Sequence, residues 1–327
     1  MKKYLIFLTI ISLCLVGCGS YGEKDIVKDF SKKINDTNGY YINGELEIVN
    51  NEDSYLYDVE VAYQKENNFK VVLKNKTNNH EQVILKNSDG VYVLTPSLNK
   101  SFKFQSEWPY NNSQSYILQT ILKDLESDTE KTFEEKDDSY IFTTKVNYSN
   151  NSELVKQQIT LDKDLNLKSV VVLNSNDEIK MKMTFNTIDY KATYDDTYFM
   201  VSSNVSNTID ETSQTLDSII YPMYVPNNTQ LSGQEKLKTE NGERIILTFS
   251  GENPFTIVQE TVNPTSELLT IPMYGEPQII TDTVGAVSED SISWISNGVE
   301  FYVVSDKLDS EEMLEVANSI NTLPIGK

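Results

Sequence analysis

The stretch Tyr55-Leu-Tyr-Asp-Val-Glu-Val-Ala-Tyr63 decides the fold, because its side chains alternate in polarity with a period of two. The odd positions are apolar, and most of the even positions are polar. This alternation is typical of an antiparallel strand that has one face on a core and the other in solvent. The stretch therefore predicts a sheet that is covered on one face only.

The same period of two continues along the chain. Further strands are expected around Phe69–Leu73, Val83–Leu85, Val91–Val93, Phe102–Phe104, Tyr140–Val146, Leu154–Leu161, Leu167–Leu173 and Lys180–Phe185. Clusters of Asn, Asp, Gly and Lys separate these runs, as turns between hairpin strands require. We expect a meander of hairpins that forms a curved antiparallel half-barrel, whose concave face needs a cover.

Two segments of this region have helical periodicity and are expected to supply that cover. The first is Glu23–Asn35, where apolar residues recur at helical spacing. The second follows Ser113, the predicted N-cap, and its apolar stripe consists of Ile117, Leu118, Ile121, Leu122 and Leu125. An aromatic loop, Glu107-Trp-Pro-Tyr110, precedes the second helix, and Pro109 excludes regular strand there.

Composition divides the mature chain into two domains. Residues 201–217 are rich in Ser, Thr, Asn and Asp and have little periodicity, so we interpret them as a linker between a domain at 18–200 and one at 218–327. The second region has more prolines and shorter expected strands, at Arg244–Phe249, Phe255–Gln259, Ser291–Ile295 and Val299–Val304. A final helix from about Ser310, capped by Asp309 or Ser310, completes a small α+β domain.

The N-terminus has the pattern of a lipoprotein signal peptide. Lys2 and Lys3 precede a short apolar run that ends in Leu15-Val-Gly-Cys18. The run is shorter than the ~20 apolar residues of a membrane-spanning helix. We expect cleavage after residue 17 and a diacylglyceryl group on Cys18, which would anchor the protein to the extracytoplasmic face of the cell membrane. The alternative is an ordinary signal peptide with a chance cysteine.

Composition also excludes several classes of function. The formal net charge of −21 disfavours nucleic acid as a partner. His80 is the only histidine and lies in a polar stretch expected to be a solvated hairpin tip, so histidine-based triads and zinc sites are not expected. Asp162–Asn166 imitates the start of an EF-hand loop but lacks its later glycine and glutamate, which indicates a hairpin turn. We expect neither a catalytic residue, nor a metal, nor a cofactor, and favour binding over catalysis.

Two parts of the sequence resemble known families. The run Gln158–Leu173, with Lys180–Phe185 and Asp195–Phe199, resembles the second half of LolA-type lipoprotein carriers, and Gly90–Lys100 is similar to their middle hairpin. Tyr221–Pro226 through Lys307–Ile320 resembles the C-terminal domain of sporulation lipoproteins of the YdcC type. The pairing of the two domains is also similar to that of the regulator RseB, and germination lipoproteins called GerS carry the LolA-like part alone.

The resemblance implies a LolA-like half-barrel with helices closing an apolar cavity, a fold that holds acyl chains or protein partners. The soluble carriers hold their lid helices with an arginine, whereas Arg244 is the single arginine of this chain and lies outside the first domain. We therefore expect a non-enzymatic, membrane-anchored protein that binds an envelope protein in sporulation or spore germination, at the outer forespore membrane if it belongs to the sporulation group. The alternative is a protein that binds a lipid or acyl chain, since a filled core and a ligand cavity demand the same apolar residues.

The candidate binding residues lie in the segment expected to cover the concave face. They are Trp108 and Tyr110 of the aromatic loop, and Ile117 and Ile121 of the helix that follows. Large aromatic side chains dominate binding hot spots, which favours a contact role for the loop. The alternative is that Trp108 packs into the core.

Overall fold

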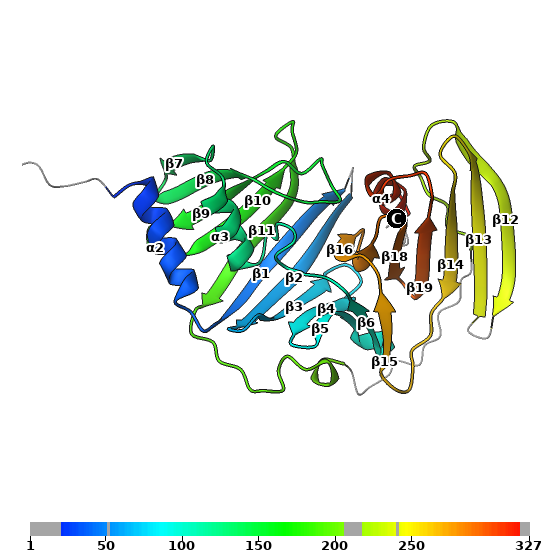
Figure 1. Cartoon of the computed structure of the whole chain (residues 1–327), viewed down its shortest axis with the longest axis horizontal. Helices are drawn as coiled ribbons and strands as arrows, with labels where there is room; N and C mark the ends of the chain where they lie inside the picture. Colours follow the sequence, from blue (N-terminus) through cyan, green and yellow to red (C-terminus); the bar gives the residue numbers. More distant parts are fainter. Residues whose placement is uncertain (1–20, 51–52, 206–217, 240–241, 321–327) are drawn as a thin grey trace, which may run out of the picture.

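The computed structural model describes residues 21–50, 53–205, 218–239 and 242–320. Two sheets, of twelve and seven strands, lie side by side and are accompanied by three α-helices within the described residues. Figure 1 shows the larger sheet with its two helices at one end of the molecule and the smaller sheet at the other.

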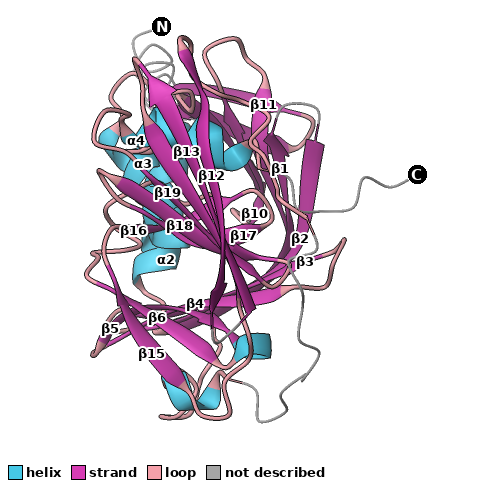
Figure 2. Ribbon diagram, turned by 90° about the vertical axis from the view of Figure 1, so that its right-hand side faces the viewer, coloured by secondary structure: helices cyan, strands magenta, loops and turns pink. Residues whose placement is uncertain are grey.

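The larger sheet has the strand order β15-β6-β5-β4-β3-β2-β1-β11-β10-β9-β8-β7. Its strands from the N-terminal part of the chain are β1 (Gly39–Asn50), β2 (Asp53–Gln64), β3 (Asn68–Asn75), β4 (Glu81–Asn87), β5 (Gly90–Thr95), β6 (Lys100–Phe104), β7 (Thr132–Lys136), β8 (Ser139–Lys145), β9 (Lys156–Asp162), β10 (Leu167–Leu173) and β11 (Ile179–Asp189). Neighbouring strands among them are antiparallel. In β2 the side chains of Tyr55, Tyr57, Val59 and Val61 are buried and the residues between them are exposed. Figure 2 shows the curvature of this sheet from the side.

Two helices, α2 (Glu23–Asn35) and α3 (Leu118–Ser127), lie against each other and over this sheet (Figure 1). Each turns its apolar stripe to the strands, so that Ile26, Phe30 and Ile34 of α2 are buried. Two short 3-10 helices, η1 (Pro96–Leu98) and η2 (Val201–Ser203), lie in connections.

The smaller sheet has the order β12-β13-β14-β19-β18-β17-β16 and is antiparallel. Its strands are β12 (Thr229–Thr239), β13 (Gly242–Gly251), β14 (Phe255–Thr261), β16 (Glu276–Ile280), β17 (Thr283–Val287), β18 (Ser291–Ser296) and β19 (Val299–Val304). Helix α4 (Ser310–Asn318) packs on this sheet with Met313, Val316 and Ala317 buried. Asp309 caps it by accepting a hydrogen bond from Glu312 N (2.9 Å), as predicted.

The two sheets are joined by backbone and side-chain hydrogen bonds. Strand β15 (Leu269–Met273) comes from the C-terminal part of the chain, yet it pairs in parallel with β6 at the edge of the larger sheet. Gln82 of β4 is buried at the junction, where its Nε2 donates to Val284 O (3.1 Å) and its Oε1 accepts from Thr283 Oγ1 (2.8 Å). Tyr57 donates its hydroxyl to Thr281 O (3.1 Å).

The predicted fold class is confirmed: the protein is α+β, with a curved antiparallel half-barrel under covering helices and a smaller C-terminal α+β part. Helix Glu23–Asn35 and strand Leu167–Leu173 have their predicted bounds. The prediction of Ser113 as an N-cap is wrong, because α3 begins at Leu118 and Ser113 Oγ accepts a hydrogen bond from Asn147 N (2.9 Å).

His80 lies at the β3–β4 hairpin tip, as predicted, but it is not a fully solvated side chain. Its Nε2 is buried and has no hydrogen-bond partner among the residues that the structure describes. The C-terminal part packs on this hairpin, and Asn78 donates to the buried Asp282 (3.0 Å). Burial lowers the pKa of His80, which the charge of Asp282 partly opposes.

Candidate functional site

The concave face of the half-barrel under α2 and α3 is filled with apolar side chains. The two helices contribute Ile26, Phe30, Ile34, Leu118, Ile121, Leu122 and Leu125 to a cluster that also contains the inward residues of the strands. Tyr40 of β1 donates its hydroxyl to Gln119 Oε1 of α3 (2.8 Å) and so fixes the helix to the sheet. This part of the half-barrel is therefore a core.

Trp108, in the aromatic loop, belongs to the same core. Its side chain is 1% exposed, and its ring lies edge-on to that of Phe69 with the centroids 6.1 Å apart. Tyr110 is half-buried, also contacts Phe69 edge-on, and donates its hydroxyl to Asn67 Oδ1 (3.0 Å). The Trp108–Pro109 peptide bond is cis.

Lysines and a serine hold the backbone of this loop in place. Lys86 Nζ donates to Trp108 O (2.6 Å), and Lys123 Nζ donates to Tyr110 O (2.9 Å). Ser106 Oγ accepts from Trp108 N (2.9 Å) and donates to Glu276 of the C-terminal part. The loop thus bridges α3, β4 and β16.

The four predicted binding residues lie together, since all of them pack in or against one apolar cluster. Ile117 and Ile121 are completely buried, so neither presents surface to a partner in this structure. A role in binding for these residues and for the aromatic loop stays a prediction. Cys18, the predicted lipid anchor, lies outside the described residues.

A cavity of about 320 Å³ opens where the concave face meets the C-terminal part. Its apolar floor includes Leu46 of β1 and Ile84 of β4, and its walls come from the loops before α3 and before β9, from β16 and from the end of α4. The volume is at the lower end of the 300–1,000 Å³ common for small-molecule sites. Sequence reasoning missed this cavity, because its residues come from segments far apart in the chain.

A partly buried carboxyl, that of Asp124, lies near the cavity on α3. Asp124 Oδ2 accepts a hydrogen bond from Gln157 Nε2 (2.9 Å). Desolvation raises the pKa of Asp124 to about 6, although hydrogen bonds from Ser113 and Gln157 act in the opposite direction. The charge of the Asp124 carboxylate contributes to the raised pKa of Tyr148, which lines the cavity.

Neither a metal centre nor a membrane span is found in the part of the chain that the structure describes. No group of three or more His, Cys, Asp and Glu side chains there is arranged to hold a metal ion. None of the described helices combines the length and the apolar character needed to cross a membrane.

Comparison with known proteins assigns the family. No family model matches the chain. The sequence is 34% identical over 327 residues to the sporulation protein YdcC of Bacillus subtilis (strain 168), an alignment that covers 98% of this chain and 97% of the relative. The chain belongs to the YdcC family.

Several solved structures resemble this YdcC-family chain at low similarity. MucB is 11% identical with a TM-score of 0.37 and covers 92% of this chain and 98% of its own. A second similar structure is that of the CwlD amidase from Clostridioides difficile in complex with the GerS lipoprotein. The match is 18% identical with a TM-score of 0.33, and it covers 54% of this chain and 100% of the chain in that structure. A LolA superfamily protein from Nitrosomonas europaea is 10% identical with a TM-score of 0.32, and the match covers 55% of this chain and 98% of that protein.

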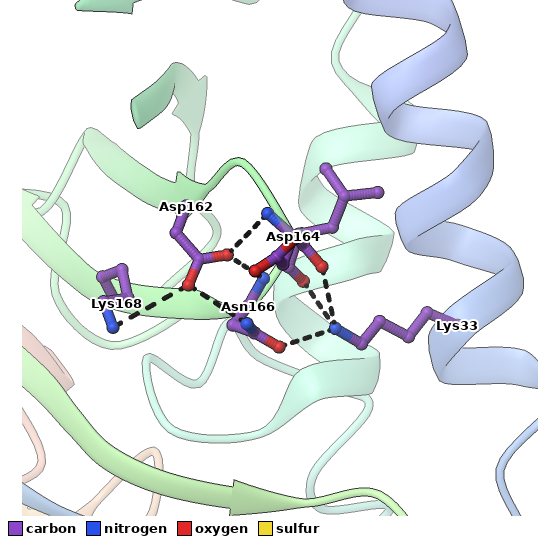
Figure 3. Close-up of polar contacts among 6 residues, drawn as sticks. Lys33, Asp162, Asp164, Asn166 and Lys168 are labelled. Atoms are coloured by element: carbon purple, nitrogen blue, oxygen red, sulfur yellow. Dashed lines mark hydrogen bonds and ion pairs between the residues drawn. The ribbon is translucent and has the colours of Figure 1, made fainter. Parts of the chain in front are cut away.

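In this YdcC-family chain a lysine holds helix α2 against the sheet (Figure 3). Lys33 Nζ donates to the carbonyl oxygens of Asp164 and Leu165 (both 3.2 Å) and to Asn166 Oδ1 (2.7 Å). Asp162 Oδ1 accepts from the backbone N–H of Asn166 (2.8 Å) and so orders the same turn. The segment that imitates an EF-hand loop is thus the β9–β10 hairpin turn, as predicted, and a lysine ammonium group is bound to its oxygens.

Proposed function

We propose that this chain is a non-enzymatic lipoprotein that acts in sporulation by binding an envelope protein. The Cys18 diacylglyceryl group anchors it to the extracytoplasmic face of the cell membrane, or of the outer forespore membrane. The identity to a sporulation protein over nearly the whole chain supports the process, and the Leu15–Cys18 pattern supports the anchor.

One observation favours a protein partner over a bound acyl chain. The apolar space under α2 and α3, where an acyl chain would lie in a half-barrel, is occupied by the side chains of the helices themselves. Filled interiors exclude ligands because protein cores pack as densely as organic crystals. The loop that joins α3 to the sheet is also hydrogen bonded on several sides, so the cover is fixed in this structure.

The anchor is tested by replacing Cys18 with Ala in the full-length chain. We expect the variant to leave the membrane fraction and to move from the detergent phase to the aqueous phase in a Triton X-type phase separation. Cys14→Ala, a cysteine change within the predicted signal peptide, is the matched control and should leave the partition unchanged. Retention of the Cys18→Ala protein in the detergent phase would show that another feature anchors it.

The partner class is tested by native mass spectrometry of the full lipidated chain, purified gently from sporulating cells. The proposal expects a stoichiometric complex with one envelope protein. A noncovalent lipid mass beyond the covalent anchor, without a protein partner, would support the acyl-chain alternative and overturn the proposal.

A further inference from the structure

Three tyrosines line the cavity at the junction. Tyr55 and Tyr116 are 6% and 5% exposed, and both line the cavity together with the half-buried Tyr148. None of their three hydroxyls has a hydrogen-bond partner among the described residues. The hydroxyl oxygens of these three tyrosines are not among the buried atoms that lack a partner, so they are open to hydrogen bonding with solvent or with a ligand in the cavity.

The remaining polar lining is mostly uncharged. Asn112, Gln114 and Asn318 each present side-chain amide groups at the cavity wall. The Nδ2 groups of Asn112 and Asn318 and the whole amide of Gln114 make no hydrogen bond within the described residues. An amide or a phenol can both donate and accept a hydrogen bond. Such a lining complements a ligand whose own groups also both donate and accept hydrogen bonds.

The charges around the cavity argue against an anionic ligand. Among the described residues that line it, Lys180 is the only basic one, and its Nζ is paired with Glu153 Oε1 at 2.7 Å. Glu153 and Glu315 add two carboxylates to the same wall. A phosphate or carboxylate would therefore meet net negative charge and no free cation.

An acyl chain and a peptide strand fit the lining less well. An acyl chain would leave the hydroxyls of the tyrosines unpaired and desolvated, which is unfavourable for a polar group. A peptide strand would add to the free edge of β16, the edge strand whose residues line the cavity. Pro277, the second residue of that strand, has no N–H, so the edge is a poor template for strand addition.

We propose that this junction cavity binds an uncharged carbohydrate. A sugar has hydroxyls that both donate and accept, which match the tyrosine hydroxyls and the Asn and Gln amides. Its C–H face packs on apolar and aromatic surface such as that of Leu46, Ile84 and Tyr55. This goes beyond the proposed function, because a carbohydrate site at the junction is independent of the protein partner.

The experiment titrates the mature lipidated chain, in a sugar-free zwitterionic detergent, with two neutral probes by ligand-observed NMR. The probes are the N-acetylglucosamine trimer and the glucose trimer cellotriose. We expect saturable binding of at least one of them. The double variant Tyr116→Phe/Tyr148→Phe should weaken it about tenfold or more, since two hydrogen bonds of ~0.5–1.5 kcal/mol each are lost. Tyr274→Phe, at a tyrosine 78% exposed and outside the cavity, is the matched control and should change it less than twofold.

A second measurement separates ligand binding from structure. Because the removed hydroxyls have no partner among the described residues, the double variant should keep the Tm of the parent within about 2 °C. A larger fall would mean that these hydroxyls hold the fold and would overturn the proposal. Absence of binding by both trimers would overturn it as well, as would saturable binding of palmitate that survives the double substitution. Loss of the protein partner in native mass spectrometry bears on the proposed function alone.

Discussion

Under α2 and α3 the concave face of the half-barrel is filled by apolar side chains, whereas at the junction with the C-terminal part the same strands border an open cavity. Strand β1 contributes Leu46 to both regions. The difference lies in the cover, because a helix with an apolar stripe closes one region and loops rich in Asn and Ser close the other. The same strand alternation can therefore produce a core or a binding site, depending on which segment packs on it.

The sharpest test of the filled region is Trp108→Ala. Truncation of a buried tryptophan leaves a large void, so we expect the free energy of unfolding to fall by about 3–5 kcal/mol in denaturant titrations. Met223→Ala, at a residue 85% exposed, should change it by less than about 0.5 kcal/mol. A stable Trp108→Ala protein that has lost its partner would instead support the predicted contact role of the loop.

The two regions can be compared directly with two isoleucines. Ile121 of α3 is completely buried in the filled region, whereas Ile279 of β16 is partly buried beside the cavity. We expect Ile121→Ala to lower the free energy of unfolding by about 2–5 kcal/mol and Ile279→Ala to lower it by about 1 kcal/mol, because fewer atoms pack around the Ile279 side chain. Equal costs in equilibrium unfolding would mean that the cavity wall is packed as tightly as the core.

Gln82→Ala tests how firmly the junction that bounds the cavity is held. The substitution leaves the backbone groups of Val284 without their partner, and we expect a loss of about 1–3 kcal/mol. Gln158→Ala, at an exposed position of β9, is the control and should be near neutral.

Limited proteolysis gives a second measure of the same junction. Cleavage within the predicted linker at 201–217 should give two resistant fragments that elute together, because β15 remains paired with β6. A resistant core that spans both parts without cleavage would contradict the predicted domain boundary.

The smallest expected effect concerns Asp124, beside the cavity. Its pKa is raised to about 6 when folded, so folding favours the protonated carboxyl, and this stabilisation is full below about pH 4 and is lost as the pH rises through 6. Asp124→Asn should therefore raise the Tm at pH 7 by a few degrees and reduce the fall in Tm between pH 5 and pH 7. Glu126→Gln, an exposed position of the same helix, should leave that pH profile unchanged.

Sequence periodicity was sufficient to predict helices and strands where the local pattern of apolar residues agrees with their burial in the fold. The apolar spacing of Glu23–Asn35 predicted a helix with those bounds, and the capping residue Asp309 predicted the start of α4. Ser113 is also of a residue type that caps helices. Its hydroxyl oxygen does not cap α3, however, but accepts a hydrogen bond from Asn147 N in a distant loop. Capping preference is a local effect of about 1 kcal/mol, which a tertiary contact can override.

The features that sequence reasoning missed depend on contacts between distant segments. β15 has exposed side chains and contains Pro272, so its residues give no strand pattern, and it is a strand only because β6 offers an edge. The cavity also gives no sequence signal, because its lining residues come from many segments and no single segment supplies enough of them to form a motif. Both arise from the way the C-terminal part packs on the half-barrel.

The pairing of β15 with β6 also sets an order of events for the newly made chain. Leu269 lies beside Lys100 in the parallel pair, so the half-barrel cannot complete its sheet until the C-terminal part has been synthesised. Until then β6 is an open edge, and open edges are sites of wrong pairing and aggregation. Contacts of such large sequence separation also slow folding. A chain that is made N-terminus first is therefore most prone to wrong pairing in the interval before residues 269–273 have been made.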